Sequence, residues 1–427
     1  MERILLTKNI FGEAYIRPAN YMGTFGPNSF GLRGLTDKAI AEKILKPGGT
    51  ARLAELAKNR QKALIVTDDN TRRTPLKRIL PHVFAELEAG GITAENTTIL
   101  IGLGTHRPMT VEEIKEKFGK EITNKYNIVN HDWSNPSQLV SYGKCDLGFE
   151  VTVNKLVKSH ELLISVGTIV PHATAGFSGG GKTIMPGISG EKTIEDTHWA
   201  ALDYPMSDIL GRADNKVREA IVSICRRIGL DFIVNTILFN GDRVYGLVAG
   251  DVEIAHREGI GISKGIYGAA VPEKADIVIA EAYPTDIDLR QAIKGICSAD
   301  IICRDRGVII LLADCPEGIA PQFPAFRQYG FSTPDMLYSD VENGRCEQKL
   351  MAYTLVAIGR IISKRVKAIL VSAHIDQEET RRLGFYYAKN LQAAVGLAFD
   401  LTNKDAKVIV LKKAGEILPI LPDHYTD

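Results

Sequence analysis

The sequence predicts an α/β protein of two lobes, each a mostly parallel sheet flanked by helices. Its 427 residues suffice for two or three domains of about 150 residues each. Short apolar runs rich in β-branched residues alternate with amphipathic stretches, which indicates strands and helices in turn. Several runs are almost continuously apolar, as expected of strands covered on both faces. We place the lobes at residues 1–268 and 269–427 and expect the active site in the cleft between them.

The first lobe opens with a β-α-β pattern. Residues 62–67 and 97–102 are predicted strands, and residues 76–89 between them have the spacing of an amphipathic helix. A further buried strand is predicted at residues 162–166. A helix that Asp214 can cap runs to about residue 228. Its apolar stripe consists of Val217, Ile221, Ile224 and Ile228.

A hairpin and a second α/β region follow. The apolar runs 232–239 and 244–248 are separated by Asn240 and Gly241, a pair that favours a tight hairpin turn. After Pro272, strands are predicted at residues 276–280, 308–313, 368–373 and 407–411. The segment 259–272, rich in glycine and alanine, is the candidate hinge. A helix near 350–385 is expected to pack back on the first lobe.

Composition narrows the kind of partner. Hydrophobic residues make up 45% of the chain and charged residues 24%, which excludes disorder as the main theme. The net charge of +1 gives no electrostatic reason to expect nucleic acid or an anionic membrane surface. We therefore expect a small-molecule partner, no nucleic acid and no membrane.

The cysteines and the apolar runs indicate in which cellular compartment the protein is expected. The six cysteines are scattered without a Cys-x-x-Cys pair, which argues against a disulfide framework or a zinc knuckle. No apolar run approaches the roughly 20 residues that span a bilayer, and the first residues lack the pattern of a secretory signal. A reducing cytoplasm fits these features best.

A glycine-rich lysine loop is the most informative segment. Residues 176–183 match the pattern G-x-x-x-x-G-K-[ST], in which backbone N–H groups and the lysine can surround a phosphate. In a P-loop hydrolase a long helix follows the lysine, whereas Pro186 and Gly187 interrupt it here. The acidic residues Asp68 and Asp69 also lie upstream instead of downstream. The alternative is a surface loop whose glycines serve only turn geometry.

Three histidines are expected in loops or at strand ends, namely His106, His172 and His198. Any one of them alone would be interpreted as structural or solvated. Together with the lysine loop they indicate a functional set.

Two polar segments follow predicted strands, where α/β sheets collect ligand groups. Residues 67–75 hold paired aspartates beside paired arginines, which suits either an anion anchor or a helix cap made by Asn70, Thr71 or Thr74. In residues 281–295, Asp286 or Asp288 can cap a helix whose Gln291 and Lys294 share one face. That face suits an anion or is simply solvated.

Together these elements resemble the lactate racemase family of nickel-pincer-nucleotide enzymes, over residues 60–300. Five separated motifs in order carry the resemblance. They are Asp69-x-Thr71-Arg72, Gly-x-Gly-Thr-His106-Arg107, His172 through Ser178-Gly179-Gly180-Gly181-Lys182 to Pro186-Gly187, Thr197-His198, and Gln291-Ala292-x-Lys294-Gly295.

The resemblance implies a nickel-pincer nucleotide, a pyridinium-3-thioamide-5-thiocarboxylic acid mononucleotide, joined to Lys182 through a thioamide. Its Ni(II) would be held by one carbon, two sulfurs and His198, a donor set that suits planar nickel. The cofactor-binding residues would be Asp69, Thr71, Ser178, Gly179, Gly180, Gly181 and Lys182. Cofactor-biosynthesis proteins would be partners.

The implied reaction inverts the carbinol carbon of a small 2-hydroxyacid by reversible hydride transfer to the pyridinium ring. His106 and His172 would alternate as acid and base for the hydroxyl proton. The residues implied for substrate binding are Arg72, Arg73, Gln291, Lys294 and Arg290. Either Arg72 or Arg73 could anchor the carboxylate.

Two departures from the family pattern concern the substrate. Arg290 stands where lactate-specific members are expected to have tyrosine, and no tryptophan follows Trp199. We therefore expect a racemase or epimerase whose substrate is larger or more polar than lactate, such as malate or an aldonate. The alternatives are a P-loop-like nucleotide hydrolase and a non-catalytic nickel- or anion-binding protein.

Overall fold

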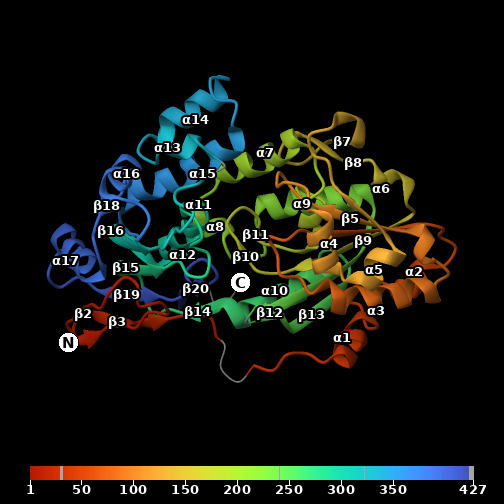
Figure 1. Cartoon of the computed structure of the whole chain (residues 1–427), viewed down its shortest axis with the longest axis horizontal. Helices are drawn as coiled ribbons and strands as arrows, with labels where there is room; N and C mark the ends of the chain where they lie inside the picture. Colours follow the sequence, from red (N-terminus) through yellow and green to blue (C-terminus); the bar gives the residue numbers. More distant parts are fainter. Residues whose placement is uncertain (29–31, 240, 322, 423–427) are drawn as a thin grey trace. The chain divides into compact units, whose positions relative to one another are not determined.

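The computed structural model describes residues 1–28, 32–239, 241–321 and 323–422. The chain divides into two compact α/β units (Figure 1). We call residues 29–201 with 212–266 the central unit. The terminal unit comprises residues 1–28, 202–211 and 267–427 and holds both chain ends. The predicted α/β class with parallel-rich sheets is confirmed.

The central unit is built on a six-stranded sheet in the order β13-β12-β9-β4-β5-β6. Only β13 is antiparallel to its neighbour. The strands are β4 (Ala63–Asp68), β5 (Thr97–Gly102), β6 (Asn127–Asn130), β9 (Leu162–Thr168), β12 (Leu230–Phe239) and β13 (Arg243–Gly250). Nearly every side chain of β4, β9 and β12 is buried, which explains their continuous apolar runs.

Helices flank this sheet. They are α1 (Asp37–Ile44), α2 (Leu53–Ala57), α3 (Leu76–Ala89), α4 (Val111–Phe118), α5 (Lys120–Lys125), α6 (Leu156–Ser159), α7 (Glu191–Trp199), α9 (Lys216–Ile228) and α10 (Ile254–Tyr267). The apolar faces of α1, α2 and α3 share one core with the sheet. Short pairs β7 (Leu139–Lys144) with β8 (Glu150–Asn154) and β10 (Pro171–His172) with β11 (Gly176–Phe177) complete the unit.

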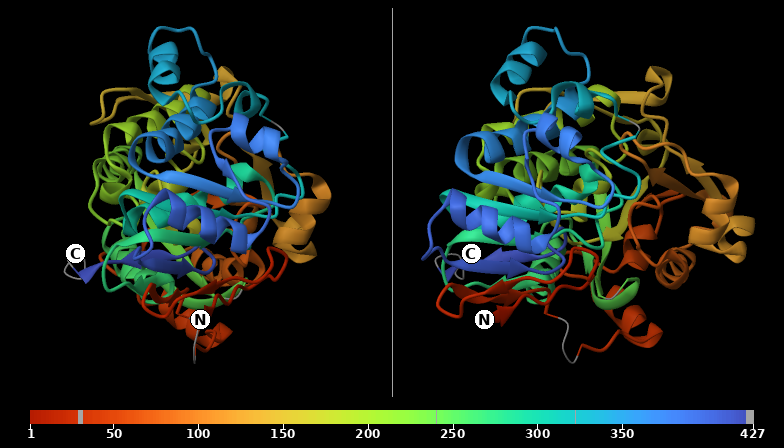
Figure 2. Two further views of the ribbon diagram at one scale, coloured as in Figure 1. Left: turned by 90° about the vertical axis from the view of Figure 1, so that its left-hand side faces the viewer. Right: turned by 60° about the vertical axis from the view of Figure 1, so that its left-hand side comes forward.

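The terminal unit has its own parallel sheet in the order β18-β17-β16-β15-β19-β3. Figure 2 draws the N-terminal part of this unit in red and its C-terminal part in blue. Its strands are β3 (Tyr21–Phe25), β15 (Ala275–Glu281), β16 (Cys303–Leu312), β17 (Lys367–Val371), β18 (Tyr386–Tyr387) and β19 (Val408–Leu411). Two small pairs are β1 (Glu2–Arg3) with β2 (Tyr15–Ile16), and β14 (Gly268–Ala270) with β20 (Leu418–Ile420). The four predicted strands of this lobe are thus confirmed, each within a few residues of its bounds except β16, which starts at Cys303.

Its helices are α8 (Met206–Ile209), α11 (Leu289–Ala292), α12 (Lys294–Ile302), α13 (Ala325–Tyr329), α14 (Pro334–Glu342), α15 (Lys349–Arg360), α16 (Gln377–Arg382) and α17 (Leu391–Leu401). The predicted helix near 350–385 is wrong as a single element, because α15 passes into a π-helical turn and then into β17. No helix among the described residues is long and apolar enough to cross a bilayer.

The division into units differs from the predicted 1–268 and 269–427. Residues 1–28 group with the terminal unit because β3 pairs in parallel with β19, Tyr21 opposite Val408 and Phe25 opposite Leu411. The candidate hinge 259–272 is mostly helix α10, which ends at Tyr267. The division at Ile266 nevertheless falls inside that segment.

The predicted hairpin and the helix before it can also be compared with the structure. β12 and β13 form an antiparallel pair, which confirms the hairpin; of its turn residues, Gly241 has φ +93° and Asn240 lies outside the described residues. The proposed cap Asp214 is wrong. Asn215 caps α9 by accepting a hydrogen bond from the Arg218 N–H at 2.9 Å, whereas exposed Asp214 pairs with Arg257.

The helix cap made by Asn215 predicts that substitutions of the neighbouring residues Asn215 and Asp214 destabilise the protein to different extents. Asn215→Ala should lower the free energy of unfolding by roughly 1 kcal/mol because a buried helix N–H loses its acceptor. Asp214→Ala breaks only an exposed ion pair and should cost at most about 0.5 kcal/mol. Urea unfolding of both variants measures the difference, and a larger loss for Asp214→Ala would contradict the assignment.

Candidate functional site

The candidate site lies at the carboxyl ends of neighbouring parallel strands in the central unit. β5, β4, β9 and β12 lie next to one another in that order, and their ends meet at one edge of the sheet. The segments that follow β4, β5 and β9 carry Asp69, Thr71, Arg72, Arg73, His106, His172, Ser178, Gly179, Gly180, Gly181 and Lys182. Gly104 after β5 donates its N–H to the Gly187 carbonyl at 3.0 Å, so two of these loops are bonded directly.

His106 is held by a buried carboxylate. Its Nδ1 lies 2.8 Å from Oδ2 of Asp69, while Oδ1 of Asp69 accepts bonds from the Thr71 N–H at 3.0 Å and the Thr71 hydroxyl at 2.6 Å. Burial opposes ionisation of Asp69, but the bonds from His106 and Thr71 outweigh it and lower its pKa. The His106 side chain is 44% exposed. The pair therefore presents an oriented imidazole to solvent.

A buried lysine that the sequence analysis missed holds the turn after β4. Lys117 of α4 donates from Nζ to the carbonyls of Asp69 at 2.7 Å and Arg72 at 2.9 Å. The same nitrogen lies 3.3 Å from Oδ1 of Asp68. Burial raises the pKa of Asp68, against the effect of Lys117. The only sequence signal for this clamp is a lysine on the inner face of an amphipathic helix.

The turn itself does not cap the next helix. Pro75 precedes α3 and no side chain caps it, so the cap proposed for Asn70, Thr71 or Thr74 is wrong. The Thr74 hydroxyl instead bonds Oδ2 of Asp68 at 2.5 Å and the Thr168 hydroxyl at 2.7 Å.

Neither arginine of this turn is in an ion pair with a described residue. Arg72 is half-buried and donates to the carbonyl oxygen of Thr71 at 3.2 Å. Arg73 is exposed. Both guanidinium groups remain candidates for anchoring a carboxylate.

The lysine loop is not followed by the helix of a P-loop. A single short 3-10 turn spans Gly180–Thr183, and the next helix, α7, begins only at Glu191. The Gly180 N–H donates to Oδ1 of Asn235 at 2.6 Å, so that group is engaged within the protein. These features count against the nucleotide hydrolase alternative.

The glycines of the loop are required by packing. A Cβ on Gly179 would lie 2.8 Å from Ile169, and a Cβ on Gly180 would lie 2.9 Å from the ring of His256. Both glycines also have positive φ, +71° and +59°. A Cβ on Gly181 would overlap the sulfur of Cys225. The glycine run therefore lets the loop lie against the sheet and helices beneath it.

Ser178 is also bonded inside the protein. Its hydroxyl donates to the Thr168 carbonyl at 2.6 Å and accepts from the Val170 N–H at 3.0 Å. These bonds join the loop to the end of β9.

Two further histidines have defined ring contacts. His172 accepts the Thr174 N–H at Nδ1, 3.1 Å, so its neutral ring carries the hydrogen on Nε2. His198 lies 2.7 Å from the Ile194 carbonyl at Nδ1, which leaves Nε2 as the nitrogen suited to a metal. His198 is in the last turn of α7, so its expected position in a loop is wrong.

The substrate-binding residues predicted for the second lobe lie in the terminal unit. Asp288 caps α11 by accepting the Gln291 N–H at 2.7 Å, which confirms that alternative. Lys294, the first residue of α12, donates from Nζ to Oε1 of Gln291 in α11 at 2.6 Å, so the two side chains meet although the predicted single helix is divided at Ile293. Arg290 lies over the ring of Phe323 at 4.3 Å, and burial lowers its pKa.

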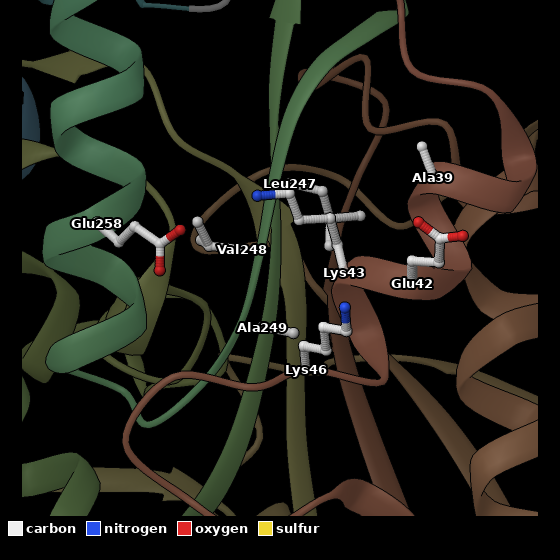
Figure 3. Close-up of a pocket in the computed structure, with 8 residues that line it drawn as sticks. All are labelled: Ala39, Glu42, Lys43, Lys46, Leu247, Val248, Ala249 and Glu258. Carbon is white, nitrogen blue, oxygen red and sulfur yellow. The ribbon is translucent and has the colours of Figure 1, made fainter.

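A surface pocket of about 320 Å³ lies elsewhere in the central unit (Figure 3). Residues of α1, β13 and α10 line it together with Lys46, and four of the lining residues are charged, namely Glu42, Lys43, Lys46 and Glu258. None of the predicted site residues lines this pocket.

Within the part of the chain that the structure describes, the protein's own donors do not form a complete metal site. Among the described residues, no three His, Cys, Asp or Glu side chains are grouped to hold a metal ion. The six cysteines are free thiols.

Comparisons with known proteins identify the family of the chain. Models of the lactate racemase N-terminal and C-terminal domains match residues 11–209 and 271–417. The lactate racemase of Thermoanaerobacterium thermosaccharolyticum is 30% identical over 385 residues, 88% of this chain and 89% of that protein. The lactate racemase of Lactiplantibacillus plantarum is 30% identical over 383 residues, with the same coverage of each chain.

Solved structures give the same result. The lactate racemase apoprotein from Thermoanaerobacterium thermosaccharolyticum matches with a TM-score of 0.86 at 27% identity, covering 96% of this chain and 97% of that one. A Thermotoga maritima protein at 22% identity, with a TM-score of 0.68 and coverage of 91% and 99%, shares the fold.

The fold and the relatives together define a racemase, and hence an isomerase. The chain belongs to the lactate racemase family, which confirms the resemblance that five short motifs indicated. Members of this family are known to need a nickel cofactor.

The buried His256 beneath the lysine loop predicts acid sensitivity. Burial, reinforced by nearby Arg218, lowers its pKa from 6.5 to about 3. The unfolded chain therefore binds more protons between these values, and stability falls as pH drops below about 6.5. His256→Gln keeps an N–H donor but cannot titrate, so it should flatten this fall by up to about 1.4 kcal/mol per pH unit. Urea unfolding from pH 7 to 4 measures both slopes, and equal slopes would contradict the assignment.

Proposed function

We propose that the chain inverts the carbinol carbon of a 2-hydroxyacid, using a nickel-pincer nucleotide joined to Lys182. The observation that carries the proposal is the Asp69–His106 pair, an oriented imidazole at the same sheet edge as the lysine loop. Family membership supports the same reaction class.

The residues present fit such a cofactor. Lys182 is half-buried on a loop whose backbone is held on both sides, as a covalent attachment point requires. The contact between Nδ1 of His198 and a carbonyl fixes the tautomer that offers Nε2 to nickel. The lack of a complete protein donor cluster in the described chain agrees with a metal held mainly by cofactor atoms.

When bound, the cofactor would supply a pyridinium carbon that accepts and returns hydride. His106 takes the hydroxyl proton at Nε2, and Asp69 stabilises the resulting imidazolium through Nδ1–H. His172 presents Nε2–H, which can donate to the oxygen of the 2-oxo intermediate. To act as the base for the other enantiomer, His172 must first exchange its Thr174 bond for a hydrogen on Nδ1.

Other residues bind the substrate. Arg72 or Arg73 anchors the carboxylate, and the mutually bonded Gln291 and Lys294 hold the carboxylate or ketone oxygen. Asp69 and Thr71 act in this scheme through His106, and Ser178 with the three glycines acts through the position of Lys182.

Intact mass spectrometry tests the attachment. Protein from a cofactor-producing host should carry a nucleotide adduct with nickel, and Lys182→Ala should lose the adduct and remain folded. Lys192→Ala, which removes an exposed lysine paired with Asp196, is the matched control and should keep it. An adduct on the Lys182→Ala protein would contradict the attachment site.

The source of the inverted hydrogen tests the chemistry. During turnover in deuterated water, the carbon-bound hydrogen of the substrate should be retained, because hydride does not exchange with solvent. His106→Ala and His172→Ala should each lose inversion. Rapid deuterium incorporation at the inverted carbon would establish a direct proton transfer and exclude the hydride mechanism.

Arg290 bears on the choice of substrate. Held against Phe323 beside Gln291, its cation can pair with a second carboxylate, as in malate, or with the hydroxyls of an aldonate. Such charge-assisted contacts contribute about 1.5–3 kcal/mol, so wild-type kcat/KM should favour malate or gluconate over lactate by roughly tenfold or more. Arg290→Tyr should reduce that preference. A wild-type preference for lactate that the substitution leaves unchanged would contradict this role.

A further inference from the structure

Segment 175–180, which precedes Lys182 and includes the short strand β11, is held by a buried arginine that none of the five motifs contains. Arg218 of α9 donates to the Ala175 carbonyl from Nε at 3.3 Å and from Nη2 at 3.1 Å. It also donates to the Phe177 carbonyl, and to the Gly179 carbonyl at 3.4 Å. The guanidinium carries several N–H donors in one plane, so a single side chain can bind all three carbonyls.

The opposite side of the same segment is bonded as well. The Ser178 carbonyl lies 2.8 Å from Nε2 of His256, and the Gly180 carbonyl accepts the Ser165 hydroxyl at 3.0 Å. Two residues after Gly180, the chain reaches Lys182. The backbone on which the lysine stands is therefore fixed from both faces.

The charge of Arg218 is unusual for its environment. The residue is only 5% exposed and no described carboxylate forms an ion pair with it. Burial lowers its pKa to about 10, so the guanidinium stays charged at neutral pH. A buried charge without a carboxylate is costly and stability alone does not favour it. The carbonyls of the lysine loop are what this charge binds.

We propose that Arg218 is the positioning residue for Lys182: its guanidinium sets the backbone of residues 175–179, so that the lysine is presented for covalent attachment of the cofactor. The attachment step rests on the proposed function, whereas the effect on the loop does not. Arg218 touches neither substrate nor cofactor in this role.

The test compares three variants. Arg218→Met removes the guanidinium at similar length, and Arg218→Lys retains a charge but lacks the planar fork. The matched control is Arg227→Met, because Arg227 is an exposed arginine of the same helix that donates to two carbonyls of another loop, Tyr142 at 3.0 Å and Lys144 at 2.7 Å.

Two readouts use the protein without cofactor. Amide hydrogen exchange should be at least about tenfold faster across residues 176–184 in Arg218→Met, with the rest of the sheet unchanged. Acetic anhydride should acetylate Lys182 at a changed rate, measured by peptide mass. Arg227→Met should match wild type in both, and Arg218→Lys should lie between.

The third readout is adduct mass after expression in a cofactor-producing host. Arg218→Met should carry at least about tenfold less adduct than wild type while thermal unfolding shows it folded. If Arg218→Met does not fold, the Arg218→Lys variant is used instead. The proposal is supported if that variant alters both the amide hydrogen exchange of the loop and the amount of cofactor adduct. A folded Arg218 variant with wild-type loop exchange and loading would overturn it. A wild-type chain without adduct would refute the proposed function, and the loop readouts would still decide the role of Arg218.

Discussion

Backbone carbonyls bound by buried cations are the interaction on which this site depends. Arg218 holds the carbonyls of the lysine loop, and Lys117 holds those of the turn that carries Asp69. Each cation comes from a helix packed against the sheet, so the helix fixes a loop that side-chain packing alone would leave adjustable. The carbonyl dipoles stabilise the buried charges of Arg218 and Lys117, and these hydrogen bonds restrict the motion of the two loops.

The need to hold the lysine loop close to the sheet and helices also explains its glycines. Their sequence pattern suggests a phosphate cradle, yet the structure uses them to bring the loop against Ile169, His256 and Cys225. Close approach lets Asn235 and Ser165 bond the loop from the sheet. The glycine pattern of residues 176–183, which suggests a phosphate-binding loop, is thus also required for close packing of the same segment.

The sequence predicted the features that depend on local pattern. Helix α3 and strand β5 were predicted with their actual bounds, and the predicted contact between Gln291 and Lys294 is present, although they belong to the successive helices α11 and α12. Features set by distant partners were not predictable in this way. β3 joins the terminal sheet only through β19, and the Arg218 and Lys117 clamps join helices to loops far along the chain. The prediction of the α9 cap was wrong by one residue because both Asp214 and Asn215 are residue types that suit the position.

The chain's membership of the lactate racemase family sets the reaction class. Arg290, which stands where lactate-specific members are expected to have tyrosine, bears on which 2-hydroxyacid is the substrate. The most direct measurement is chiral chromatography of lactate, malate and gluconate incubated with the nickel-loaded protein. The account predicts that a single enantiomer or epimer is converted to a mixture, and that protein lacking nickel leaves it unchanged. Nickel-loaded protein that carries the adduct and yet inverts none of a wide set of 2-hydroxyacids would contradict it.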